Sequence, residues 1–208
     1  MEIKDRIVQE ASILFYRNGV RSMTMSDIAN QLGISKRTLY EVFQDKEDLL
    51  EECINANRKK TEHEINNLIN SSEDVIDALM RIYAKHLSDA QSINRSMLHD
   101  LRKYHAPIYR KVENQQHSAY YAFIELLKKG IQQDLIREDT NVEVMMWLVQ
   151  AQFRALINDE VIPTDKYPIK EFIRVIILNS IRGVATPAGV AQIDHWIEKI
   201  KENKIKQL

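Results

Sequence analysis

The segment from Met25 to Val42 constrains the fold of this chain more than any other part of the sequence. Ala29 is a small residue where two helices would approach closely. Gly33 follows four positions later, where the chain must turn and where a residue that tolerates positive φ relieves strain. Ser35 can then cap a second helix. Apolar residues supply the inner face of both arms: Ile28, Leu32, Ile34, Leu39 and Val42. This spacing predicts a helix-turn-helix.

The second arm of this motif has the charge pattern of a surface that lies against phosphates and base edges. Lys36, Arg37 and Thr38 stand in its first turn, and no acidic side chain occurs from Ile28 until Glu41. The chain as a whole is not basic, with a formal net charge of −1, and residues 1–50 carry 7 Lys and Arg against 8 Asp and Glu. Affinity for DNA must therefore come from a local concentration of positive charge. The alternative is an ordinary helical hairpin with no role in DNA binding.

Composition and apolar spacing predict an all-α protein. Five glycines and four prolines among 208 residues are few turn-forming residues for a many-stranded β fold, and long stretches are rich in helix-forming residues. We expect a three-helix head joined by a connector helix to a larger helical-bundle body, with the boundary between residues 1–48 and 49–208. A head of this size buries little core, so it would depend on the connector helix for stability.

The positions of caps, prolines and apolar stripes predict the helices of both parts. In the head and connector, helices are expected over about Ile3–Arg17, from Thr24 or Ser26 to Gly33, from the Ser35 cap to about Phe43, and from the Asp45 cap through Arg58. In the body, they are expected after Ser72, over Ile93–Tyr104, from Pro107 to near Gly130, after a Thr140 cap, over Ile169–Arg182 and over Gly189–Ile205.

The single cysteine, Cys53, excludes an intramolecular disulfide and a cysteine-based zinc site. Its place in an apolar-periodic helix favours a packed thiol over a redox switch. The sequence shows no charged-then-apolar leader and no apolar run long enough to span a bilayer. We therefore expect a cytoplasmic protein with no membrane partner.

The head closely resembles the signature of the tetracycline-repressor (TetR) family of bacterial transcription regulators over about residues 5–55. The resemblance implies a DNA-binding regulator, in the usual case a repressor, that binds a palindromic double-stranded operator as a homodimer. It also implies that the body dimerises through its last long helices and encloses a pocket for a small-molecule effector. The matching residues are Thr24–Ala29, Leu32–Tyr40, Phe43, Lys46 and Leu49–Leu50.

Carried over to this sequence, the resemblance places Tyr40 and Lys46 at phosphates. The physical case agrees for Lys46, because a helix N-terminus already favours an anion. Tyr40 could instead be an ordinary surface tyrosine. Arg37 could grip a guanine bidentately or bind a phosphate, and the sequence leaves both roles open. The implied DNA-binding residues are Thr24, Ser35, Lys36, Arg37, Thr38, Tyr40 and Lys46.

For the effector pocket, we expect a site among the helices that begin near Ser72, Pro107 and Thr140. Aromatic and polar groups interrupt otherwise apolar stripes there, as they do at ligand sites. The alternative for each of these residues is an ordinary place in the core or on the surface. The candidates are Tyr83, His86, His99, Tyr120, Phe123, Trp147, Gln150 and Arg154.

A paired protein is expected because two-fold symmetric DNA sites are bound by two-fold dimers. Apolar residues of the body also exceed what one small bundle easily buries. Effector binding would then move the helix that begins at Asp45 and change the spacing of the two heads. The apolar residues concerned are Val149, Phe153, Ile169, Phe172, Ile173, Ile176 and Ile177.

The sequence also bears on two other classes of function. A di-iron carboxylate enzyme needs Glu-x-x-His pairs, and none of the six histidines has a glutamate three residues before it. No glycine-rich phosphate loop or nucleophile elbow occurs either, so we expect no enzymatic activity, no cofactor and no metal site. A helical adaptor that binds protein through its hairpin would keep its partner after Lys36 and Lys46 are neutralised, whereas a DNA-binding regulator would lose its DNA.

Overall fold

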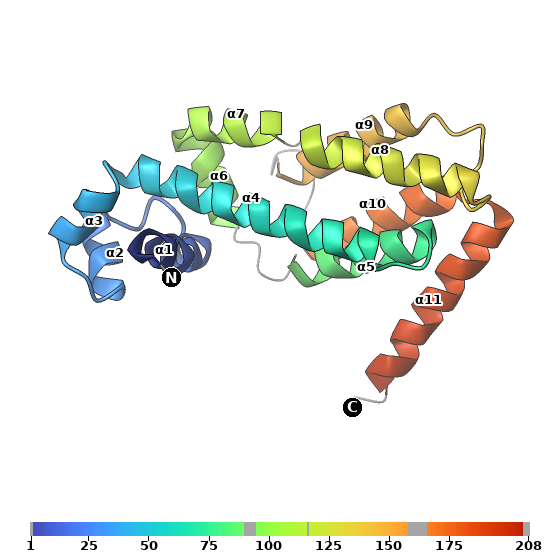
Figure 1. Ribbon diagram of the computed structural model, residues 1–208, viewed down its shortest axis with the longest axis horizontal. Helices are drawn as coiled ribbons and strands as arrows, with labels where there is room; N and C mark the ends of the chain where they lie inside the picture. The colour runs from blue at the N-terminus through green and yellow to red at the C-terminus, as the bar shows by residue number, and fades with distance from the viewer. Residues whose placement is uncertain (1, 90–94, 116, 158–165, 206–208) are drawn as a thin grey trace. The chain divides into compact units, whose positions relative to one another are not determined.

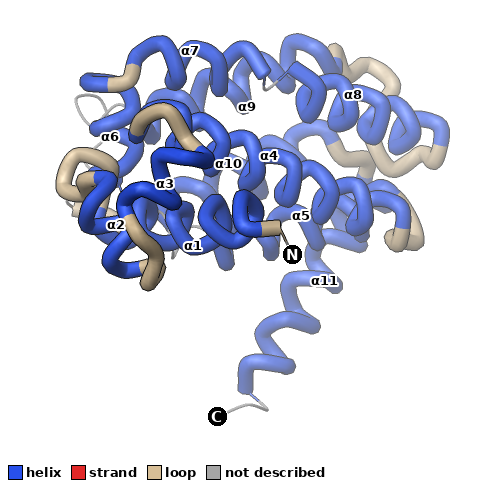
Figure 2. The backbone as a smooth tube through the Cα atoms, turned by 60° about the vertical axis from the view of Figure 1, so that its left-hand side comes forward, coloured by secondary structure: helices blue, strands red, loops and turns tan. Residues whose placement is uncertain are grey.

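The computed structural model describes residues 2–89, 95–115, 117–157 and 166–205, without the side chains of 95–99, 112–115, 117–120, 157 and 201–205. Eleven α-helices form within these residues (Figure 1), and an isolated bridge between Ile136 and Ala185 is the only β pairing there. Figure 2 shows the same chain as helices joined by short loops. The all-α prediction is confirmed. No described helix is both long enough and apolar enough to cross a membrane.

The chain divides into two compact units whose boundary lies within one long helix. The first unit contains Met1–Glu64 and Ser92–Gln116, and the second contains Ile65–Gln91 and His117–Leu208. Helix α4, Lys46–Asn70, therefore begins in the first unit and ends in the second. The boundary expected between residues 48 and 49 separates parts by function, so it stays a prediction.

The first unit combines the expected three-helix head with the start of α4 and two helices from later in the sequence. All of these helices contribute to one hydrophobic core. Its fully buried large side chains include Phe15, Leu39 and Phe43 from the head and Leu49 and Leu50 from α4. The helices are α1 (Ile3–Asn18), α2 (Met25–Gln31), α3 (Lys36–Val42), the first part of α4, α6 (Arg95–Tyr104) and α7 (Ala106–Gln115).

Local chemistry accounts for where the helices of this unit begin and end. Helix α1 ends at Gly19, whose φ of 82° suits a residue without a side chain, and the Gly19 amide donates to Phe15 O at 3.0 Å. Helix α4 starts after Asp45, whose Oδ1 accepts from the Asp48 amide at 2.9 Å. Both of these helix ends were predicted from the sequence.

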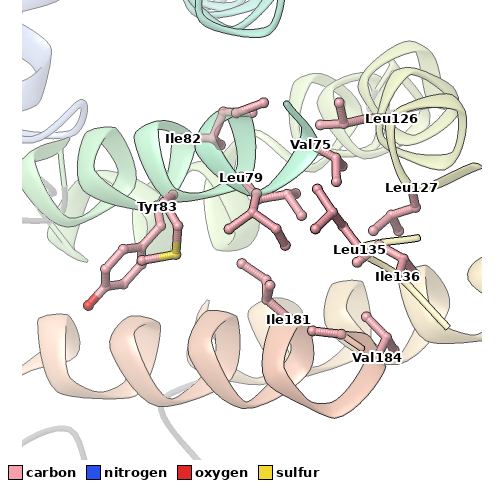
Figure 3. Close-up of a cluster of buried hydrophobic side chains, with 14 of the residues drawn as sticks. Val75, Leu79, Ile82, Tyr83, Leu126, Leu127, Leu135, Ile136, Ile181 and Val184 are labelled. Atoms are coloured by element: carbon pink, nitrogen blue, oxygen red, sulfur yellow. The ribbon is translucent and has the colours of Figure 1, made fainter. Parts of the chain in front are cut away.

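The second unit has its own core, to which helices far apart in the sequence contribute. Figure 3 shows Val75 and Leu79 of α5 facing Ile181 and Val184 of α10, with Leu127 of α8 at one end of the cluster. The helices of this unit are the end of α4, α5 (Val75–Asp89), α8 (His117–Gln132), α9 (Val142–Ile157), α10 (Ile169–Val184) and α11 (Pro187–Ile205).

All seven apolar residues that suggested a dimer pack in or against one cluster inside this unit. Ile173 and Ile176 are buried together with Leu156. The remaining members of the set, Val149, Phe153, Ile169, Phe172 and Ile177, are partly buried against the same cluster. The large exposed apolar side chains of α9 are different ones, namely Val144, Trp147 and Leu148.

One predicted helix is in fact two. The segment expected to run from Pro107 to near Gly130 forms α7 and α8, on either side of residue 116. Ile108 of α7 belongs to the first core and Leu127 of α8 to the second, and apolar periodicity does not show which core a stripe serves. Helix α8 also continues past Gly130. That glycine is needed for close packing, since a Cβ there would lie 2.5 Å from Ile136 Cγ1.

The predicted Thr140 cap is also wrong. Asn141, the residue directly before α9, accepts a hydrogen bond from the Val144 amide at 3.1 Å, as an N-cap does. The Thr140 hydroxyl is buried and makes no hydrogen bond within the described part of the chain. Similarly, α11 begins at Pro187 rather than near Gly189, because proline suits the first position of a helix.

We predict that Cys53 does not react with thiol reagents in the folded protein. Its side chain is 3% exposed, and burial raises the pKa of the thiol to about 11, so almost no thiolate forms at neutral pH. The native protein should leave Ellman's reagent unchanged over an hour, and the same sample in concentrated guanidinium chloride should release one equivalent of chromophore. Rapid reaction of the native protein would contradict a packed thiol.

Candidate nucleic-acid interface

Helix α2 begins with a reciprocal capping box. The Thr24 hydroxyl oxygen accepts from the Asp27 amide at 3.2 Å, and Asp27 Oδ2 accepts from the Thr24 amide at 2.9 Å. The Thr24 hydroxyl also donates to Asp27 Oδ2 at 2.6 Å, and these hydrogen bonds lower the pKa of the Asp27 carboxyl. Thr24 therefore caps the helix as predicted. Its amide and hydroxyl protons already have an acceptor, so a phosphate contact would require its side chain to turn.

The turn between α2 and α3 depends on Gly33. Its φ is +66°, in the left-handed region, and its amide donates to Asn30 O at 3.2 Å. The Ile34 amide donates to Ala29 O at 3.0 Å, and the Arg6 guanidinium donates to Leu32 O at 3.0 Å from α1. These bonds satisfy carbonyl groups that the end of α2 would otherwise leave unpaired. Gly33 has the backbone conformation that the sequence predicted.

Helix α3 is fixed at its start by a side-chain cap and along its inner side by a buried leucine. The Ser35 hydroxyl oxygen accepts from the Thr38 amide at 3.0 Å and lies 2.8 Å from the Thr38 hydroxyl oxygen. Leu39 is completely buried in the first core. Because one side of this short helix is buried, its other side chains must face outward.

The outward side of α3 brings four of the predicted DNA-binding residues into one short strip. Arg37 is 89% exposed, and its Nε donates to Glu41 Oε1 at 2.9 Å. Tyr40 is 46% exposed, and Lys36 Nζ lies 5.8 Å from the centre of the Tyr40 ring. Thr38 is half-buried beside Ser35. The strip therefore combines two cations, a phenol and one hydroxyl group on one helix, and the Ser35 cap adds a second hydroxyl at its start.

Lys46 differs from the other predicted contacts because its ammonium group already binds the protein. It donates to Val20 O at 3.2 Å and to Met23 O at 3.1 Å. The lysine therefore ties the first turn of α4 to the segment between α1 and α2. An ammonium group has three N–H donors, so one remains for an acceptor outside the chain.

Sequence reasoning missed residues of α6, and His105 directly after it, that hold the head. Asp100 Oδ2 accepts from the Arg21 amide at 3.0 Å, and the Asp100 side chain is buried. The Arg21 guanidinium donates to the Tyr104 hydroxyl at 3.2 Å, and the buried His105 Nδ1 lies 3.1 Å from Glu47 Oε1. The partners are 58 to 83 positions apart in the chain, so no local pattern could have paired them.

Three of the predicted effector-binding residues lie on or near the inner side of α5 and α8. Tyr83 is buried, and burial raises the pKa of its hydroxyl. Figure 3 shows its ring at the edge of the second core, with the hydroxyl oxygen directed away from the labelled aliphatic side chains. His86 is half-buried, 6.4 Å from the Phe153 ring centre, and burial lowers the pKa of its imidazole. Phe123 is partly buried against the second core.

The other predicted effector-binding residues whose side chains are described all lie on α9. Trp147 and Arg154 are exposed on α9, and Gln150 is half-buried there. The side chains of His99 and Tyr120 lie outside the described residues. Within the described residues, no three His, Cys, Asp or Glu side chains gather to bind a metal ion.

Comparison with known proteins identifies the head. The family model for bacterial regulatory proteins of the tetR family matches residues 7–53, which include all of α2 and α3. The head is a TetR-family helix-turn-helix domain. It is also 27% identical over 180 residues to the uncharacterized HTH-type transcriptional regulator YvaF of Bacillus subtilis, covering 85% of this chain and 90% of the relative. The chain thus has a TetR-family helix-turn-helix DNA-binding domain and is similar over most of its length to a transcriptional regulator, and this family is not a class of enzymes.

Solved structures share the fold at low sequence identity. A transcriptional regulator from Saccharomonospora viridis in complex with choline superposes with a TM-score of 0.71 at 20% identity, covering 88% of this chain and 97% of that chain. The regulator FadR from Bacillus subtilis in complex with stearoyl-CoA gives a TM-score of 0.62 at 20% identity, covering 86% and 98%. The fold shared with these regulators therefore extends beyond the matched head to the body of the chain.

We predict opposite effects on stability from two glycine-to-alanine substitutions. Gly33→Ala should lower the free energy of unfolding by about 1–2 kcal/mol, because a Cβ is strained at positive φ. Gly183→Ala, inside α10, should raise it by about 0.5–1 kcal/mol. Neither added Cβ would meet an atom within 4 Å, so the pair isolates backbone conformation from crowding. Chemical denaturation measures both, and equal effects would refute the assigned role of Gly33.

Proposed function

We propose that this chain is a repressor that binds a palindromic operator as a homodimer and is controlled by a small-molecule effector. Helix α3 lies in the major groove, with Ser35, Lys36, Arg37 and Thr38 facing the DNA. Thr24, Tyr40 and Lys46 contact the phosphates on either side of it. Residues 1–48 carry the DNA-binding activity, and residues 49–208 carry dimerisation and effector binding.

The observation that carries this proposal is the exposed strip on α3. A helix enters the major groove through side chains on its outer side, while its inner side stays fixed to the rest of the domain. Leu39 provides that fixed inner side, and Lys36, Arg37 and Tyr40 remain exposed. Since the chain is not basic overall, binding depends on these few exposed side chains, and Lys36 supplies local positive charge.

Dimerisation is supported by the exposed apolar side chains of α9. Trp147 is 52% exposed and Leu148 is 60% exposed, and they are neighbours of Val144 by one helical turn. Contiguous exposed apolar residues on a helix mark an interaction surface, and a two-fold pair would cover them with the same residues of the second copy. The pairing places two identical heads on the two halves of a palindromic site.

An effector site in the body is supported by the aromatic and polar side chains beside the second core. Tyr83 and His86 lie one turn apart on α5, and Phe153 of α9 lies against His86. Proteins of the same fold were solved with choline and with stearoyl-CoA, so this fold accommodates small molecules of very different chemistry. The effector acts on DNA binding by moving α4. A few kcal/mol of differential affinity between two states is sufficient for such control.

We predict that the purified protein selects a palindromic sequence from randomised DNA. Lys36→Ala should weaken binding to that sequence in a gel shift and lower the slope of log Kd against log salt by about one for each protomer in the complex. Lys129→Ala removes an exposed lysine from α8 and should change neither quantity. Selection of no sequence would contradict the proposal. Equal effects of the two substitutions would remove α3 from the interface.

We predict that Leu148→Asp converts the protein to a monomer at micromolar concentration. A charge at the centre of an apolar interface is left without water or a partner, so association becomes unfavourable. Ile13→Asp places the same charge on another exposed aliphatic residue, in α1, which is 48% exposed, and should leave the dimer intact. Sedimentation velocity distinguishes the species. A monomeric wild-type protein would overturn the homodimer.

A further inference from the structure

Two side chains of α3 lie on the ridge directly opposite its buried side. An α-helix turns about 100° per residue, so residues two positions before and two positions after Leu39 each lie about 160° from it. These residues are Arg37 and Glu41, and their side chains are 89% and 59% exposed. If α3 enters the major groove with its outer side first, Arg37 and Glu41 approach the base edges more closely than any other side chain of the helix.

The neighbouring pair on α3 occupies a different side of the helix. Lys36 and Tyr40 lie about 60° and 100° from Leu39, and the lysine ammonium lies 5.8 Å from the centre of the tyrosine ring. Side chains on the flank of a helix in a groove face the sugar-phosphate strands at its edge. The arrangement therefore separates the two cations of α3, with Lys36 toward a strand and Arg37 toward the bases.

The contact between Arg37 and Glu41 leaves the end of the guanidinium available. Arg37 Nε donates to Glu41 Oε1 at 2.9 Å, which occupies the edge of the guanidinium nearest the helix. This bond uses Nε alone, so the parallel N–H donors of the two terminal nitrogens, Nη1 and Nη2, are left for another acceptor. Guanine presents two acceptors, O6 and N7, in the major groove at the spacing that these donors match.

We propose that Arg37 binds one guanine in each half-site through Nη1 and Nη2, and that Glu41 is the positioning residue that holds Arg37 in this orientation. This inference rests on the proposed function, because it requires that α3 bind DNA. An exposed ion pair of this kind adds little to stability, so its effect is on the direction of the side chain. A fixed guanidinium also loses less rotamer freedom when it binds the base.

The same pair argues against a phosphate as the target of Arg37. The Glu41 carboxylate beside the guanidinium would face any phosphate that Arg37 reached, and like charges repel. The pair is also neutral as a unit, so it releases few counterions from DNA. Specificity for a base, rather than affinity for all sequences, is what a carboxylate-supported arginine supplies.

The test is selection from randomised DNA with the wild-type protein, Arg37→Ala, Arg37→Lys and Glu41→Gln. The wild type should prefer guanine at one position of each half-site by roughly 5- to 100-fold. Arg37→Ala and Arg37→Lys should both lose this preference, although lysine keeps the charge, and the preferences at other positions should remain. Glu41→Gln should weaken the same preference at the same position. Glu125→Gln, which removes an exposed carboxylate paired with Lys128 on α8, is the matched control and should change nothing.

A double-variant cycle shows whether Glu41 acts through Arg37. In the Arg37→Ala background, Glu41→Gln should have no further effect on base preference, because its only role there has already been lost. A persistent effect would mean that Glu41 itself contacts a base, and it would overturn the positioning role. Thermal unfolding of each variant should match the wild type, since both side chains are exposed.

Other results overturn the inference and leave the proposed function intact. If Arg37→Ala weakens binding to every sequence equally and lowers the salt slope, while Arg37→Lys restores both, Arg37 binds a phosphate. If Glu41→Gln leaves the guanine preference at its wild-type value, the ion pair does not position Arg37. A wild-type protein that selects no sequence instead refutes the proposed function itself.

Discussion

The DNA-binding head depends on a hydrophobic core that its own three helices cannot complete. A domain of about 45 residues buries too little apolar surface to be stable alone. Helix α4 completes the core with Leu49, Leu50 and Cys53. Two further helices extend it, α6 with Leu101 and α7 with Ile108. The orientation of α3 follows from this core, because the helix has seven residues and is anchored through Leu39.

Polar groups at the edge of the same core hold the segment between α1 and α2 through hydrogen bonds. Lys46 satisfies the Val20 and Met23 carbonyls, and Asp100 satisfies the Arg21 amide, so the segment between α1 and α2 is held by α4 and α6 together. An unpaired buried amide or carboxylate costs more than a hydrogen bond between the two contributes. A displacement of α6 relative to this segment must therefore break a partly buried hydrogen bond, which favours one position of the head within this unit.

The sequence predicted the features that local chemistry decides. The caps at Thr24, Ser35 and Asp45 and the positive φ of Gly33 each depend on residues within four positions, and all four are confirmed. Local chemistry does not decide which of two neighbouring residues caps a helix, as with Thr140 and Asn141. It also does not decide which of two cores an apolar stripe faces, as in α7 and α8. Contacts such as Asp100 with Arg21 cannot be predicted in this way, because they depend on the packing of segments 79 positions apart.

The charge of the chain determines where its specificity must come from in the proposed complex. A protein with a net charge of −1 has little general attraction for the DNA backbone, so it gains little from sites of arbitrary sequence. Contacts to base edges then contribute a larger share of the total affinity than they would in a basic protein. Because a two-fold dimer repeats each base contact, a mismatch in both half-sites costs twice the free energy of one. The fold-preference for the correct base that one Glu41-supported Arg37 gives in a half-site would therefore enter squared into the dimer's ratio of specific to non-specific binding.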